Sequence, residues 1–191
     1  MPLSSCSDSE LMMAVADNDK DAFKEIMQRY QARVYRLVYR FTSDEEITKE
    51  LTQDIFLKLY KAAGSYSPDA QFFTWLYRIV TNYCINFTRK KKRDPLHHTD
   101  ETLDEKNSVV YGGSGHNNQL STLEKEERAV LVRKALDSLP ERQRMAIVLL
   151  RFEGLGYREI SKAMGCSVSA VESLIYRGMD ALKKRFSVVW E

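Results

Sequence analysis

The sequence predicts an all-α protein of two small helical domains joined by a flexible linker, with a helix-turn-helix in the second domain. Apolar residues recur at three- and four-residue steps through both ends of the chain. No convincing alternating strand pattern interrupts them, and a polar, glycine-containing stretch separates them. The chain has 191 residues, 43% hydrophobic and 29% charged, which suits one or two globular domains. The predicted boundaries are 1–93, a linker over 94–121, and 122–191.

The first domain is expected to hold three long helices. An apolar stripe over 22–41 predicts the first, and the sequence SDEE at 43–46 reads as a capping box that starts the second. Glycine, serine and proline over 64–68 end the second helix, and a third is expected over 71–92.

The connector over 94–121 carries one proline and three glycines without a helical apolar period. Its 28 residues reach about 90 Å when fully extended, at ~3.3 Å each. The alternative is a long surface loop within one domain, although structureless loops of this length are uncommon in compact domains. Residues 94–124 have a net charge of −5, between segments of +3 (1–93) and +4 (125–191). Two basic modules suit a polyanion that is contacted at two places.

The second domain is expected to hold helices over about 122–137, to about residue 152 after Pro140, over 157–164, and over 168–186. The last two form the predicted helix-turn-helix, because Gly165 permits the positive φ of the turn and apolar residues on both sides pin the helices together. Residues on the outer face suit a DNA major groove; they are Ser169, Glu172, Ser173, Tyr176 and Arg177. The alternatives are a plain helical hairpin with a solvated face and, for Glu172, a helix cap formed with Ser169.

The third helix of the first domain combines six aromatic residues with a terminal RKKKR, in the sequence FFTWLYRIVTNYCINFTRKKKR. Basic residues neutralise phosphates and aromatic rings stack on unpaired bases, so this helix suits melted nucleic acid. The expected contacts are Arg78, Asn82, Arg89 and Lys90, together with Tyr66, a lone aromatic in a turn-rich loop with little core to join. The alternatives are core packing for the aromatic side chains and a nuclear-localisation role for RKKKR.

The helix before it presents a face opposite its apolar stripe, made of Glu50, Gln53, Asp54 and Leu57. Two acids, an amide and an exposed leucine can dock on a partner protein, although a plain solvated face has the same composition.

Several classes of function are not expected. No segment is long and apolar enough to cross a bilayer, and the acidic N-terminus does not read as a secretory signal, so we expect a cytoplasmic protein without membrane insertion. The cysteines form no C-x-x-C pair, which argues against a disulfide framework and a metal site. All three histidines fall in the linker and no glycine-rich phosphate loop is present, so we expect no enzyme, cofactor or small-molecule substrate.

Four motifs stand in a recognisable order: DKDAFKEIMQRYQARVYRLVYR, ELTQDIFLKLYKA, FFTWLYRIVTN and LDSLPERQRMAIVLLRFEGLGYREISKAMGCSVSAVESLIYR. With a linker between the third and fourth, the chain resembles an extracytoplasmic-function (ECF) sigma factor of bacterial RNA polymerase. The resemblance implies a transcription initiation factor whose partners are core RNA polymerase (its clamp helices and flap), promoter DNA and an anti-sigma factor.

The resemblance also implies roles for particular residues. Glu50, Gln53, Asp54 and Leu57 fall in the clamp-binding region. The Tyr66 loop and Asn82 fall where the family captures a flipped base of the minus-ten element. Glu172, Ser173, Tyr176 and Arg177 fall on the helix that reads the minus-thirty-five element, with Glu172 where many members carry a basic residue. A repressor or activator that binds duplex DNA without polymerase is the alternative, and it leaves the first domain unexplained.

Overall fold

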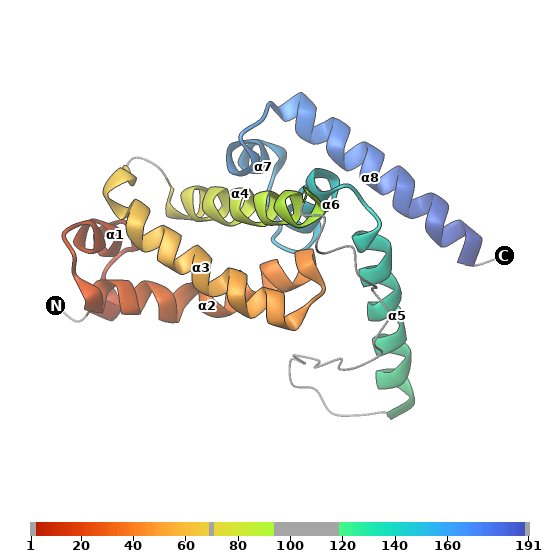
Figure 1. Ribbon diagram of the computed structural model, residues 1–191, viewed down its shortest axis with the longest axis horizontal. Helices are drawn as coiled ribbons and strands as arrows, with labels where there is room; N and C mark the ends of the chain where they lie inside the picture. Colours follow the sequence, from red (N-terminus) through yellow and green to blue (C-terminus); the bar gives the residue numbers. More distant parts are fainter. Residues whose placement is uncertain (1–2, 69–70, 94–118, 190–191) are drawn as a thin grey trace.

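The computed structural model describes residues 3–68, 71–93 and 119–189, and within these ranges every regular element is a helix (Figure 1). In chain order they are η1 (Leu3–Ser5), α1 (Asp8–Ala16), α2 (Lys20–Thr42), α3 (Glu45–Ala62), η2 (Ala63–Ser65), α4 (Phe72–Arg93), α5 (Gln119–Asp137), α6 (Glu141–Arg151), α7 (Tyr157–Met164) and α8 (Val168–Val189). The predicted all-α class is confirmed for the described chain.

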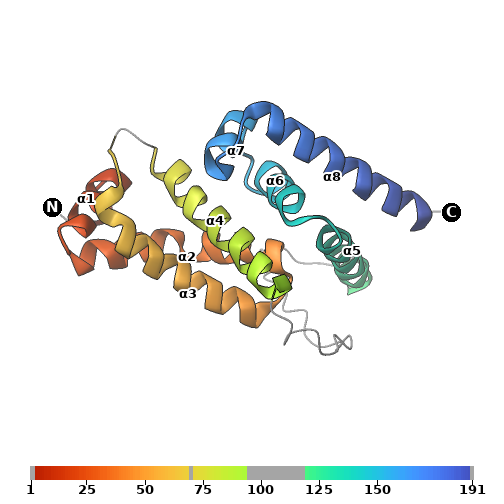
Figure 2. The ribbon, with the colours of Figure 1, turned by 45° about the horizontal axis from the view of Figure 1, so that its top comes forward.

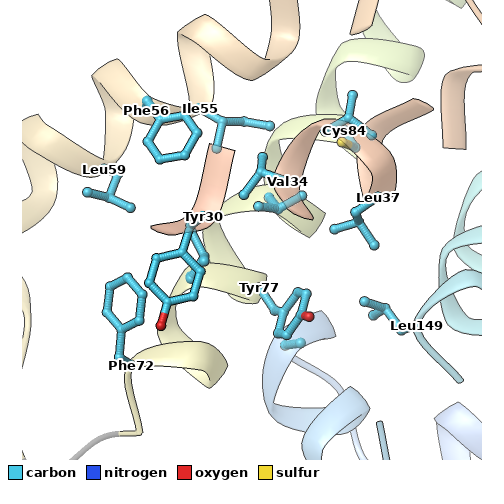
Figure 3. Packing of buried hydrophobic residues seen from close by; sticks show 14 of the residues in the cluster. Tyr30, Val34, Leu37, Ile55, Phe56, Leu59, Phe72, Tyr77, Cys84 and Leu149 are labelled. Carbon is cyan, nitrogen blue, oxygen red and sulfur yellow. The ribbon is translucent and has the colours of Figure 1, made fainter. Parts of the chain in front are cut away.

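The N-terminal unit, helices α1 to α4, is built around α2, which packs against α1, α3 and α4 (Figure 1). Its buried side chains recur every three or four positions along α2, as the apolar stripe predicts: Ala22, Ile26, Tyr30, Val34, Leu37, Val38 and Phe41. Complementary stripes on α3 and α4 complete this part of the core, where Ile55, Phe56 and Phe72 lie near Tyr30 and Val34 (Figure 3).

Helix α1 is an element that the sequence reasoning missed. Its start carries a capping box, since Ser7 N–H donates to Glu10 Oε2 at 2.7 Å and Glu10 N–H donates to Ser7 Oγ at 3.3 Å. Leu11, Met12 and Val15 are almost fully buried against the rest of the unit. The pattern Ser-x-x-Glu followed by apolar residues was the available signal.

The start of α3 differs by one residue from the predicted capping box. Ser43 adopts a left-handed conformation (φ +57°) and closes α2, so it is not free to cap the next helix. Asp44 is the N-cap instead, and its carboxylate accepts a hydrogen bond from Ile47 N–H at 2.9 Å.

The C-terminal unit, helices α5 to α8, confirms the predicted helices, with α7 at the predicted bounds. Helices α6 and α8 cross closely at Gly178, where an added Cβ would lie 2.6 Å from Ile147 Cδ1. Residues 119–121, predicted as the end of the linker, are the first residues of α5. The rest of the predicted linker, residues 94–118, lies outside the described residues.

The two units pack against each other, a contact that the sequence did not predict. Helix α4 packs against α7 and α6 (Figure 2). Helix α2 also contacts α5 and α6. Buried side chains from both units join in one apolar cluster, in which Figure 3 labels Tyr77 of α4 and Leu149 of α6.

Candidate nucleic-acid interface

A cleft of about 870 Å³ opens between α3 and the outer face of α4, and we call it the α4 groove. It is lined by four cations, two amides and three aromatic rings, and none of the described residues that line it carries a carboxylate. The lining residues are Lys58, Ala62, Ser65, Trp75, Arg78, Ile79, Asn82, Tyr83, Asn86, Phe87, Arg89 and Lys90. Cations pair with phosphates, amides with base edges, and aromatic rings with base faces, so the chemistry of the groove suits a single nucleic-acid strand.

The amphipathic pattern of α4 creates this lining. Buried residues such as Leu76, Val80 and Cys84 occupy one side of the helix. Positions offset from them point into the groove, and these include the four predicted DNA contacts on α4: Arg78, Asn82, Arg89 and Lys90. The sequence reasoning missed Lys58, Trp75 and Asn86. Trp75 and Asn86 lie seven residues before and four after Asn82, so helical spacing was the signal for both.

Tyr66 does not have the surroundings expected of it. Its side chain is only 9% exposed, so the expectation that it has little core to join is wrong. Its hydroxyl pairs with Ser9 Oγ at 2.8 Å, and its ring meets Trp75 edge-on at 5.2 Å between centroids. The described part of the loop folds back onto the start of α4. Tyr66 therefore packs against Trp75, and Trp75 lines the groove.

Three of the four α3 residues predicted to face a partner are exposed to solvent. Glu50, Gln53 and Leu57 are exposed, and Leu57 keeps 56% of its surface open to solvent. Asp54 is half-buried and accepts a hydrogen bond from the Tyr83 hydroxyl at 2.5 Å. That hydrogen bond, with burial second, raises the pKa of Tyr83 to about 12. Asp54 therefore ties the α3 face to the wall of the α4 groove.

The predicted helix-turn-helix is formed by α7 and α8. Gly165 closes α7 at φ +59°, the positive φ that a glycine was expected to permit in this turn. Its apolar residues pack between the two helices, with Ile160 and Ala163 of α7 and Val171 of α8 fully buried. Gly156 precedes α7 and donates its N–H to Glu159 Oε2 at 2.7 Å, which fixes the first turn.

The first half of α8 presents the predicted DNA-facing side chains to solvent. Ser169, Glu172, Ser173, Tyr176 and Arg177 are all exposed, and Tyr176 keeps 75% of its surface open. In Figure 2, α8 lies on the outer side of the C-terminal unit, away from α2 and α3. The cap alternative for Glu172 is wrong, because α8 starts at Val168 and the Ser167 hydroxyl accepts from Ala170 N–H at 3.2 Å.

Among the described residues, no group of three or more His, Cys, Asp or Glu side chains is placed to hold a metal ion. Within the same residues, no helix combines the length and apolar character that a bilayer crossing requires.

Two protein-family models match this chain, one over the α4 groove and one over the helix-turn-helix. The family model for Sigma-70 region 2 matches residues 26–94, which include the α4 groove. The model for Sigma-70 region 4 matches residues 129–182, which include α7 and the first half of α8.

Whole-length relatives agree with these matches. The chain is 33% identical to the RNA polymerase sigma-H factor of Pseudomonas aeruginosa over 93% of this chain and 92% of that protein. It is also 33% identical to the ECF RNA polymerase sigma-E factor of Escherichia coli K12, over 94% of each. A solved structure with the same fold is the sigma factor RpoE of Bartonella quintana, in complex with the anti-sigma factor NepR (TM-score 0.62, 23% identity, 89% of this chain and 99% of that chain). The chain therefore belongs to the ECF family of RNA polymerase sigma factors, which are transcription initiation factors and not enzymes.

Proposed function

We propose that the α4 groove holds the melted minus-ten element of a promoter, and that the α8 face reads the minus-thirty-five element while the α3 face binds the polymerase clamp. The observation that carries this proposal is the lining of the groove. Cations, amides and an indole ring without an opposing carboxylate suit an unpaired strand better than a closed duplex, since stacking needs bases that are out of the helix.

Holding an unpaired strand is what a melting factor must do. Extruding a base from the duplex costs a few kcal/mol, so an open promoter needs contacts that the closed promoter lacks. Trp75 offers a stacking surface, and Asn82 and Asn86 offer donors and acceptors for base edges. Arg78, together with the other cations of the groove, neutralises phosphates on either side of an extruded base.

The α8 face supplies the duplex-reading chemistry. Arg177 can pair with guanine, Glu172 can accept from the cytosine amino group, and the serine hydroxyls suit either donors or acceptors. All three kinds of side chain are exposed on consecutive turns, so they enter a major groove together.

The test is promoter opening by the holoenzyme, followed by permanganate footprinting of unpaired thymines. Asn82→Ala should slow opening on a closed template and leave core-polymerase binding and upstream-duplex binding near the wild-type values. A pre-melted template should restore part of the loss, because the unpairing cost is already met.

The matched control is Gln31→Ala, which removes an exposed amide from α2 outside the groove. Opening at the wild-type rate by a folded Asn82→Ala variant would overturn the base-capture role. Full promoter affinity without core polymerase would instead indicate a duplex-binding regulator.

The same proposal includes a cytoplasmic location, where polymerase and promoters are found, and control by an anti-sigma factor. A fold shared with a sigma factor that was solved with an anti-sigma factor supports the second point. Co-purification of the full chain with a candidate anti-sigma protein, and inhibition of transcription by that protein, are the corresponding measurements.

A further inference from the structure

The loop between α6 and α7, residues Phe152–Gly156, inserts an acid into the N-terminal unit. The Glu153 side chain is only 4% exposed. Its Oε2 accepts from the Tyr77 hydroxyl at 2.7 Å and from Arg33 Nε at 3.0 Å, and its Oε1 accepts from Arg40 Nη1 at 3.3 Å. All three donors belong to α2 and α4, so this one carboxylate joins the two units.

The loop is held in the shape that presents Glu153. Glu153 N–H donates to Val148 O and Leu155 N–H donates to Leu149 O, which anchors both sides of the loop to the end of α6. Gly154 lies between them at φ +69°. The backbone that carries Glu153 is thus held by its own unit, while the carboxylate itself is held by α2 and α4.

Aromatic rings hold the two arginines in place. The Arg40 guanidinium lies 4.8 Å from the centre of the Phe152 ring, which comes from the C-terminal unit. The Arg33 guanidinium lies 4.7 Å from the centre of the Phe73 ring, within its own unit. Burial, and then the bond to Glu153, raise the pKa of Tyr77, so its hydroxyl stays protonated and remains a donor.

A second polar junction lies at the end of α2. Arg144 Nη1 of α6 donates to the Phe41 carbonyl at 2.8 Å and to Asp137 Oδ1 at 3.0 Å. The same Asp137 oxygen accepts from Ser43 Oγ at 3.0 Å. A third hydrogen bond between the units runs from Arg133 Nη1 of α5 to the Tyr39 hydroxyl at 2.7 Å, so directional polar contacts accompany the apolar cluster that the two units share.

The docked arrangement cannot serve both DNA-reading surfaces on one promoter. Promoter elements centred near positions −35 and −10 are about 25 base pairs apart, or roughly 85 Å at ~3.4 Å per base pair. In the docked chain α4 packs directly on α7, and α7 packs on α8. Packed helices lie about 8–10 Å apart, so the two surfaces are separated by a few helix diameters.

We propose that Glu153 is an intramolecular latch that holds the free chain closed, and that it must release before the two surfaces can span a promoter. The inference rests on the proposed roles of the α4 groove and the α8 face. A closed form that cannot span the promoter lowers the apparent affinity by the fraction of molecules that are open. Loss of the latch should therefore raise the open fraction before polymerase or DNA is added.

The experiment is single-molecule energy transfer in the full chain, with dyes at the exposed positions Gln28 of α2 and Lys183 of α8. The wild-type chain alone should give mainly the transfer efficiency of the docked arrangement, and core polymerase should convert it to lower transfer. Glu153→Gln should raise the low-transfer fraction about tenfold or more without polymerase. Tyr77→Phe, which removes one donor to Glu153, should raise it less.

The matched control is Glu45→Gln, which removes one acid from an exposed ion pair with Lys49 inside the N-terminal unit. It should leave the transfer distribution unchanged. Circular dichroism and urea unfolding establish whether each variant is folded. If Glu153→Gln does not fold, Tyr77→Phe is the variant that tests the latch.

A wild-type chain that is mainly open in solution would overturn the latch, as would folded Glu153→Gln and Tyr77→Phe variants with the wild-type distribution. These measurements use neither DNA nor transcription. Failure of the latch is thus separate from failure of the proposed promoter contacts, which the footprinting experiment reports.

Discussion

Replacement of Trp75 tests whether the α4 groove captures bases, because Trp75 and Tyr66 are neighbouring aromatic residues in different environments. Trp75 lines the groove, while Tyr66 is buried behind it with its hydroxyl on Ser9. We expect Trp75→Ala to reduce open-complex formation and Tyr66→Phe to leave it unchanged.

The magnitude follows from stacking. One base on one aromatic ring contributes ~1–3 kcal/mol, which corresponds to about a 5- to 150-fold loss of open complex at equilibrium. Trp75→Phe keeps a smaller ring in place and should lose less. Tyr66→Phe removes a partly buried hydrogen bond and should lower the free energy of unfolding by ~0.5–1.5 kcal/mol, with no effect on opening.

The assay combines permanganate footprinting on closed and pre-melted templates with urea unfolding of each variant. Trp75→Ala also removes packing against Tyr66 and Phe72, so its opening defect counts only at temperatures where the variant is fully folded. The reasoning fails if folded Trp75→Ala opens promoters like the wild type. It also fails if Tyr66→Phe slows opening as much as Trp75→Ala.

Three further changes address the other surfaces. Asp54→Ala combined with Leu57→Arg should abolish core-polymerase binding at normal helical content in circular dichroism, and normal holoenzyme formation would contradict the α3 assignment. Arg177→Ala should weaken binding to the upstream element by about 1–3 kcal/mol if Arg177 pairs with a base. If Arg177 contacts only phosphate, the loss of affinity should be equal on all sequences, with a shallower dependence on salt concentration. Fluorescence anisotropy across a salt series distinguishes the two. Gly178→Ala should lower the free energy of unfolding by about 1–3 kcal/mol in urea, because the added Cβ meets Ile147 at 2.6 Å; unchanged stability would mean that α6 and α8 shift apart at no cost.

The long helices were predictable because their apolar spacing is a local signal that burial preserves. The α2 stripe and the α7 bounds both appear in the structure as the spacing predicts. Helix boundaries were less predictable where two caps compete for adjacent residues. At the α2–α3 corner, the left-handed Ser43 ends one helix and leaves the next cap to Asp44.

The environments of single side chains depended on contacts that no local pattern contains. Tyr66 follows Gly64 and precedes Pro68, which reads as an exposed turn, yet Phe72 and Trp75 fold over it. Glu153 precedes a glycine in a short loop and reads as a solvated acid. Its three partners lie 76, 113 and 120 residues away in the sequence, so only the tertiary structure brings them together.

The exposure of the charged groups at Glu153 explains why such a junction can open. Arg33 and Arg40 keep 39% and 34% of their side chains exposed while docked, whereas Glu153 keeps 4%. In the docked chain the carboxylate is therefore far more desolvated than its cations, and the hydration that Glu153 would regain on opening offsets part of the hydrogen bonds it would lose. We therefore expect the contact to fix one closed arrangement at a small net free energy, because the desolvation of the carboxylate offsets its hydrogen bonds. The differential affinity of polymerase for the open chain then supplies what remains of the opening cost, since a ligand shifts such an equilibrium only by that difference.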